Sequence, residues 1–331
     1  MYKDKEYFCI FAVAMDRNRI EYIDLAKGIC MVLVVLGHFQ EKYGYAQLQE
    51  LNCTLSYIRM PLYFFLSGIF FKTYGSFRYF LTKKTNHLVI PYLVFLLLGF
   101  VTFRNFPIWF LSSLFYSNIL FYGCKRLDML CPDRYVLPVA CAVLSVTGFF
   151  LPGGQGCDNQ LMEQMYYMET AMTCLGFFYA GYALRSYSDF IQPEKKLGLV
   201  YDILLIAICA GVVVFVGWYY DYADTGFRLN FYGYSLIGMY AAGLAGCAAV
   251  VILSKRLNRV PYISFIGRYS IIVLLTHFPL IYYVGRVLPD ERLLTVVLVF
   301  LLEIPVVLVG RRYFPYVFAQ KELIPLDGKE S

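Results

Sequence analysis

Charged residues are scarce in this sequence of 331 amino acids. Asp, Glu, Lys and Arg make up 16% of the chain, whereas a soluble domain contains about 25%. Hydrophobic residues reach 60%, compared with roughly 45–50% in soluble domains. The shortage of charge excludes an ordinary soluble domain. It predicts an all-α polytopic membrane protein that has the lipid bilayer as a partner.

Motifs that bind nucleotides or metals are also missing. The sequence contains no GxGxxG, no Walker loop and no zinc-ligand spacing, and its ten cysteines form no CxxC pair. Most cysteines lie in apolar runs, where they behave as small hydrophobic residues, while Cys53 and Cys157 fall in predicted outer loops. The formal charge of +6 fits a topology signal better than nucleic-acid binding. We therefore predict no bound cofactor, no metal site and no nucleic-acid partner.

Apolar segments recur at about the length that spans a ~30 Å hydrocarbon core. With the N-terminus placed inside, 22 of the 29 Lys and Arg residues fall in inner segments and five in outer loops. Because inner loops of membrane proteins carry excess positive charge, the pattern predicts about ten transmembrane helices with both termini cytoplasmic. The helices are expected near residues 24–42, 54–71, 88–103, 108–123, 135–151, 168–185, 199–218, 230–253, 265–285 and 293–313.

No predicted loop is long enough to form a separate folded domain, so one domain is expected. We divide the chain into an N-terminal extension (1–18), a transmembrane domain (19–313) and a cytoplasmic tail (314–331). The apolar run 7–15 resembles a short signal peptide, but cleavage there would leave basic residues outside the membrane. We interpret 1–18 as an extension, with Met15 as an alternative start.

Three ionisable residues share one stripe of the first predicted helix: Asp24, Lys27 and His38. A helix turns about 100° and rises about 1.5 Å per residue. His38 is therefore about 20° beyond three full turns from Lys27, and about 16 Å away along the axis. Ionisable groups inside a membrane are costly and usually face an interior cavity. A helix-end Asp–Lys pair and one hydrogen-bonded histidine would explain the same spacing.

Other polar residues fall at membrane depth in later predicted helices. The set expected to line one buried cavity is His38, Ser67, His277 and Glu303, and Trp109 opens the fourth helix on the same, outer side. Each of them also has a structural interpretation, as a helix-packing, interface-anchoring or hydrogen-bonded core residue.

The loop after the second predicted helix is the most basic one. Its residues are Lys72, Arg78, Lys83, Lys84 and His87. Such a cluster fits ordinary inner-side charge or contact with anionic lipids. It also fits a seat for a phosphorylated cytosolic ligand, since Lys and Arg bind phosphates. A basic seat together with a deep histidine suggests a donor whose head stays at the inner face while its long arm enters the membrane.

Two blocks of the sequence resemble the membrane-bound acyltransferase 3 family. The first is Tyr22-Ile-Asp24-Leu-Ala-Lys27-Gly28-Ile29 with His38 at the far end of the helix, and the second is Met60-Pro-Leu-Tyr-Phe-Phe-Leu-Ser67-Gly68. Shorter matches are Pro91-Tyr92, Trp109-Phe110-Leu111 and His277-Phe-Pro279-Leu280. The resemblance covers roughly residues 19–310, and Lys27 stands where the family often has arginine.

The resemblance implies a membrane O-acyltransferase. Such an enzyme transfers an acyl group, usually acetyl, from acyl-CoA to a hydroxyl. The acceptors that the resemblance implies are sugars of surface or exopolysaccharides, lipid-linked glycans, or small alcohols and antibiotics, and a surface or exopolysaccharide sugar is the one expected here. The subgroup closest in character acts as fucose-type sugar O-acetylases, and an inner cell membrane location is expected. His38 is then the general base, because a neutral imidazole can take the proton of an attacking hydroxyl. Asp24 and Lys27 would form a donor portal, with Glu303 or His277 orienting His38.

Two other functions fit the same pattern. Ten helices and a polar interior also suit a multipass exporter of a polysaccharide precursor, and a non-catalytic relative would keep the fold for binding only. Acetyl transfer from acetyl-CoA separates an enzyme from a transporter.

Overall fold

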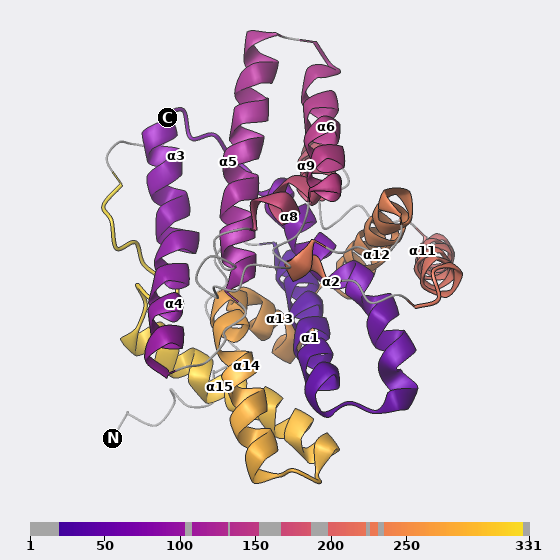
Figure 1. Cartoon of the computed structure of the whole chain (residues 1–331), viewed down its shortest axis with the longest axis vertical. Helices are drawn as coiled ribbons and strands as arrows, with labels where there is room; N and C mark the ends of the chain where they lie inside the picture. The colour runs from indigo at the N-terminus through magenta and orange to yellow at the C-terminus, as the bar shows by residue number, and fades with distance from the viewer. Residues whose placement is uncertain are drawn as a thin grey trace.

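The computed structural model describes residues 20–102, 108–131, 133–151, 167–186, 198–222, 226–230 and 235–326. Across these ranges the chain is helical and contains no strand (Figure 1). Six of the described helices are long and apolar enough to cross a membrane. The prediction of an all-α chain with several membrane-crossing helices is confirmed, while ten crossings and cytoplasmic termini stay predictions. The expected extension 1–18, Met15 and Cys157 lie outside the described residues.

Every segment expected to be helical contains a helix. The first half of the chain forms α1 (Glu21–Tyr43), α2 (Gln49–Ile69), α3 (Phe77–Lys84), the π-helical turn η3 (Thr85–Val89), α4 (Ile90–Thr102), α5 (Trp109–Leu130) and α6 (Val136–Phe150). The second half forms α8 (Met168–Thr173), α9 (Leu175–Ser186), α11 (Leu199–Tyr219), η4 (Phe227–Leu229), α12 (Leu236–Leu257), α13 (Pro261–Arg268), α14 (Ser270–Val287) and α15 (Arg292–Tyr313).

Three of these helices differ from the predicted bounds in an informative way. α2 begins at Gln49, before the expected residue 54, and so includes Cys53, which is buried inside the helix rather than in a loop. The third predicted helix continues without a break from α3 through η3 into α4. The ninth is split at Tyr269 into α13 and α14, which lie in different directions in Figure 1.

α2 is enclosed by other helices rather than by lipid. It packs against α1, α9, α11 and α12. It is also outside the six apolar helices, since it carries Asn52 and Arg59, both buried. Polar side chains are tolerated at membrane depth where they face protein or a cavity. The enclosure of α2 therefore permits a charged side chain in the middle of the helix.

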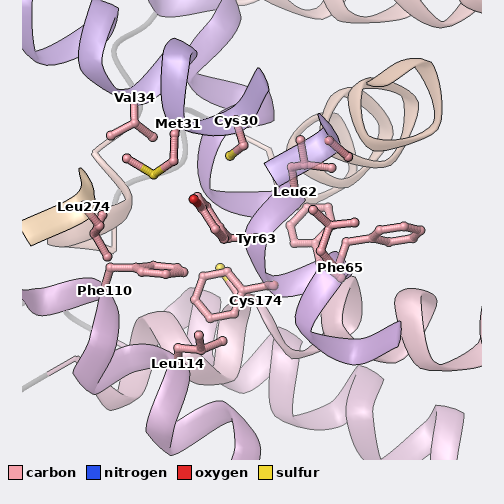
Figure 2. Close-up of a cluster of buried hydrophobic side chains, with 14 of the residues drawn as sticks. Cys30, Met31, Val34, Leu62, Tyr63, Phe65, Phe110, Leu114, Cys174 and Leu274 are labelled. Carbon is pink, nitrogen blue, oxygen red and sulfur yellow. The ribbon is translucent and has the colours of Figure 1, made fainter. Parts of the chain in front are cut away.

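The apolar core gathers around the middle of α2. Tyr63 lies at its centre in Figure 2, and its ring is 5.2 Å from that of Phe110 on α5. Residues from α1, α5 and α14, together with Cys174 between α8 and α9, complete the cluster. Those labelled with Tyr63 and Phe110 are Cys30, Met31, Val34, Leu62, Phe65, Leu114, Cys174 and Leu274. This packing fixes α1 against α2, the two helices that carry the family motifs.

Glycines allow the helices of two pairs to pack so closely that their backbones are in contact. A Cβ on Gly68 would overlap the carbonyl oxygen of Phe178 on α9, and one on Gly181 would overlap that of Phe65 on α2. Gly28 on α1 and Gly267 on α13 have the same reciprocal relation. Small residues hold membrane helices together in this way because close backbones gain van der Waals contact. Gly68 therefore has the helix-packing role that the sequence offered as one interpretation of this segment.

We expect Gly68→Ala to destabilise the protein. The added methyl group meets backbone, which cannot rotate away, and overpacking of this kind costs about 1–3 kcal/mol. Thermal unfolding in detergent measures the loss as a lower Tm. Gly123→Ala on α5 is the matched control, because nothing lies within 4 Å of its Cβ position. Equal Tm values for the two variants would contradict the packing role.

Candidate active site

A pocket of about 370 Å³ lies where α1, α2, α5, η4 and α14 meet. Its charged and polar walls come from distant parts of the chain: His38 and Glu41 on α1, Arg59 on α2, Trp109 on α5 and Arg228 on η4. Phe227 and Phe278 add apolar surface. A mostly apolar hollow with a few converging polar groups is the usual form of a small-molecule site.

His38 is held by Glu41, one helical turn further along α1. His38 Nδ1 lies 3.0 Å from Glu41 Oε2. A carboxylate only accepts hydrogen bonds, so Nδ1 carries the proton and donates it. The lone pair of the neutral ring is then on Nε2. The His38 side chain is 26% exposed and that of Glu41 57%, so both remain accessible from the pocket. This is the arrangement of a general base with an orienting carboxylate.

A second histidine fixes the plane of the first. The rings of His38 and His277 are 5.4 Å apart and nearly parallel, and the Phe278 ring meets His38 edge-on at 5.6 Å. His277 is fully buried, and its Nδ1–H donates to the carbonyl oxygen of Val273 at 2.8 Å. The pair of α14 side chains therefore leaves the His38 ring little room to rotate.

Glu303 and Ser67 lie away from this pocket. Glu303 is buried on α15, where its Oε2 accepts a hydrogen bond of 3.0 Å from Thr276. Ser67 lies on α2 near the contact with α9. Of the four polar residues expected to line one cavity, only His38 lines this pocket, and His277 packs against His38. The carboxylate that pairs with His38 is Glu41, not Glu303.

Sequence reasoning missed three charged residues of the pocket. Glu41 could have been found from its position three residues after His38, since residues at this spacing face each other on a helix. With the second helix expected from residue 54, Arg59 would lie near the end of that helix, whereas it is buried in mid-helix. Arg228 lies in a short segment that hydrogen bonds hold in place. Thr170 donates to Phe227 O, and Asn230 donates to Gly148 O and Leu151 O. Only the fold brings that segment to the site.

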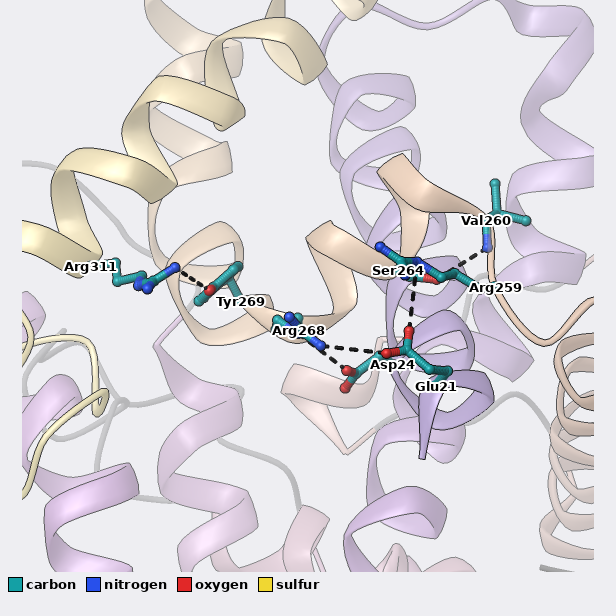
Figure 3. Close-up of polar contacts among 8 residues, drawn as sticks. All are labelled: Glu21, Asp24, Arg259, Val260, Ser264, Arg268, Tyr269 and Arg311. Atoms are coloured by element: carbon teal, nitrogen blue, oxygen red, sulfur yellow. Dashed lines mark hydrogen bonds and ion pairs between the residues drawn. The ribbon is translucent and has the colours of Figure 1, made fainter. Parts of the chain in front are cut away.

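The opposite end of α1 carries an ion-pair network (Figure 3). Asp24 lies 3.6 Å from Arg268 on α13. Glu21 pairs with the same Arg268 at 3.6 Å and with Arg259 at 3.8 Å. The ammonium group of Lys27 lies 5.2 Å from the ring centre of Phe70, at the end of α2. Asp24 therefore ties α1 to α13, and the portal role of Lys27 stays a prediction.

The basic residues of the predicted donor seat lie on and before α3. Lys83 is 4.5 Å from the ring centre of Tyr74, and Lys84 is 5.8 Å from that of Phe80. Lys72 and Arg78 are exposed. Phe70, which contacts Lys27, and Tyr74, which contacts Lys83, both lie in the connection between α2 and α3. The basic cluster and Lys27 therefore lie at one end of α1, and His38 lies towards the other end. No group of three or more His, Cys, Asp or Glu residues within the described ranges is placed to hold a metal ion.

The C-terminal segment is hydrogen-bonded to the π-helical turn η3 beside this basic cluster, and we call this contact the strap. Asn86, almost fully buried, accepts from the amides of Leu323 and Ile324 at 3.1 and 2.8 Å, and donates to Ile324 O at 2.8 Å. In Figure 1 the yellow end of the chain runs beside α3 and α4. One side chain therefore joins segments more than 200 residues apart in the sequence.

We expect Asn86→Ala to release this strap. The amides of Leu323 and Ile324 lose their acceptor, so their hydrogen exchange should become at least about tenfold faster, as for a segment that opens locally. Hydrogen-exchange mass spectrometry on peptides covering 314–326 measures the change. Asn118→Ala is the control, because the Asn118 amide donates within its own helix, to Leu114 O. Unchanged exchange in Asn86→Ala would show that other contacts hold the tail.

The family model of the acyltransferase domain matches residues 20–312. The chain therefore belongs to the acyltransferase 3 family, and it is a membrane acyltransferase. The comparison with curated proteins and the comparison with solved structures gave no match. The matched region contains every residue of the pocket and ends before the strapped tail.

Proposed function

We propose that the protein is an O-acyltransferase that moves an acyl group, usually acetyl, from acyl-CoA to a sugar hydroxyl of a surface or exopolysaccharide. The observation that carries this proposal is the His38–Glu41 pair in a pocket of about 370 Å³. A sugar hydroxyl is a poor nucleophile at neutral pH, and a neutral histidine with a fixed tautomer is the group that activates it. Family membership supplies the acyl-transfer chemistry.

The positions of these groups support the following reaction. The acceptor hydroxyl attacks the thioester carbonyl carbon while its proton passes to His38 Nε2. Glu41 stabilises the imidazolium that forms, because its carboxylate accepts from Nδ1. The tetrahedral intermediate then collapses, the C–S bond breaks and the thiolate leaves. The thiolate takes the proton from His38, which returns to its neutral form.

The donor is proposed to enter from the other end of α1. Lys27 and the cluster Lys72, Arg78, Lys83 and Lys84 would hold the phosphates of CoA. Lys27 and His38 are about 16 Å apart along a straight helix, and an extended pantetheine arm spans roughly 15–20 Å. The thioester would then reach His38 while the nucleotide stays outside the bilayer. A multi-pass location in the inner cell membrane and a glycan or lipid-linked sugar acceptor complete the proposal.

Radiolabelled acetyl-CoA tests the proposed function directly. Membranes containing the protein should transfer label to surface polysaccharide and release one thiol of CoA for each ester formed, whereas membranes lacking it should not. The second candidate, an exporter of a polysaccharide precursor, rests on the buried polar groups of the helix bundle. It predicts glycan movement with no transferred label. A non-catalytic binding protein predicts retention of acetyl-CoA without thiol release.

A further inference from the structure

Arg59 is a buried cation in the wall of the pocket that holds His38. It is 9% exposed and lies in the eleventh position of α2, well inside the helix. Its backbone carbonyl accepts from the thiol of Cys30 on α1 at 2.8 Å. A cation in such a place is expensive to desolvate, and ionisable groups at membrane depth are functional candidates by default.

The guanidinium is anchored on one edge and directed at the catalytic helix on the other. Nη2 donates to the backbone and side-chain oxygens of Asn52, two turns earlier on α2. Nη1 lies against the α carbon of Gly37, where any Cβ would overlap it. Gly37 directly precedes His38. The planar fork is therefore fixed beside the residue that receives the proton.

We infer that Arg59 stabilises the oxyanion formed during acyl transfer. This inference rests on the proposed function. When the hydroxyl oxygen bonds to the thioester carbon, the carbonyl electron pair moves to its oxygen, which becomes negatively charged. Arg59 donates to that oxygen, and the charge returns to the carbonyl as the thiolate departs. A preorganised donor in a site shielded from water lowers this barrier more than the same donor in water.

The other arginine of the pocket is less suited to this task. Arg228 is exposed on η4, where water screens its charge. Arg59 is buried, and the neighbouring Glu41 carboxylate interacts electrostatically with its charge. The pocket thus has a base with its carboxylate on α1 and a buried positive charge on α2. That division matches a reaction in which a proton leaves one oxygen while negative charge builds on another.

Chemical rescue tests the assignment. Arg59→Ala should lower kcat roughly 10²- to 10³-fold, as for the loss of an oxyanion donor, with the acetyl-CoA KM within about threefold of wild type. Guanidinium chloride at tens of millimolar should raise the kcat of Arg59→Ala at least about tenfold. A purely structural role of Arg59 predicts no increase. Arg134→Ala is the control, since Arg134 is exposed and bonds to Tyr135 OH.

Two further variants keep the test decisive if Arg59→Ala does not fold. Arg59→Lys retains the charge but loses the fork, and it should keep its Tm yet lose most of kcat. Gly37→Ala displaces the guanidinium without removing it, and it should reduce kcat in the same way. Folded Arg59 variants with kcat within about threefold of wild type overturn the oxyanion role alone. A wild-type protein that transfers no acyl group overturns the proposed function as well.

Discussion

His38→Ala is expected to lower kcat for acyl transfer by roughly 10²- to 10⁴-fold, the range that a positioned general base contributes. The acceptor hydroxyl would then have to lose its proton without help from Nε2. Binding of acetyl-CoA should be unchanged, because the donor phosphates are proposed to bind at the other end of α1. Release of CoA thiol and retention of a labelled donor by the same purified protein measure the two effects.

The control for His38→Ala lies on the same helix. Leu36→Ala changes an exposed residue two positions earlier, on a different side of α1, and should leave kcat near the wild-type value. The two variants are compared at equal amounts of protein in the membrane, which separates a loss of catalysis from a loss of folded protein. Full transfer by His38→Ala would contradict the role of this residue as base, and would leave the fold and the family membership unaffected.

Glu41→Gln is expected to lower kcat by roughly tenfold to a hundredfold, as when an orienting partner of a functional histidine is removed. The amide has nearly the same size, but it removes the negative charge that stabilises the imidazolium. It also permits the other His38 tautomer, since its NH₂ group can donate to Nδ1. The KM for both substrates should change little, so steady-state kinetics in detergent separates orientation from binding.

Glu50→Gln provides the matched control for Glu41→Gln. Glu50 is an exposed carboxylate in the first turn of α2 and is outside the pocket lining. Its replacement should leave kcat within about twofold of wild type, in line with the small effects of exposed charges. Equal kinetics for the two variants would remove Glu41 from the catalytic pair, even if His38 proved essential.

The helices were predictable because each is a long apolar run, and His38 was predictable because an ionisable residue inside such a run is unusual. The start of α2 was not, since Gln49, Glu50 and Asn52 look like a loop. Placing that start at residue 54 made Arg59 a helix-end residue. Its actual start puts Arg59 in mid-helix, beside Gly37.

Contacts between distant segments were beyond the reach of sequence patterns. The arrival of Arg228 at the pocket depends on hydrogen bonds from Asn230 and Thr170, and the tail is fixed by one asparagine in a π-helical turn. In the sequence, none of these three polar side chains can be told apart from an ordinary loop or helix residue. Periodicity reports which face of an element is buried, and it does not report which element covers that face.

The enclosure of α2 also constrains how the protein is made. α2 is not among the six apolar helices, and two of its neighbours, α9 and α12, are synthesised more than 100 residues later. While those neighbours are missing, the faces of α2 that they cover would be open to lipid. We therefore expect the newly made α2 to stay against α1, or inside the insertion machinery, until α9 and α12 emerge and close around it. Assembly of the bundle, rather than insertion of each helix, then completes the membrane integration of the region that contains the pocket.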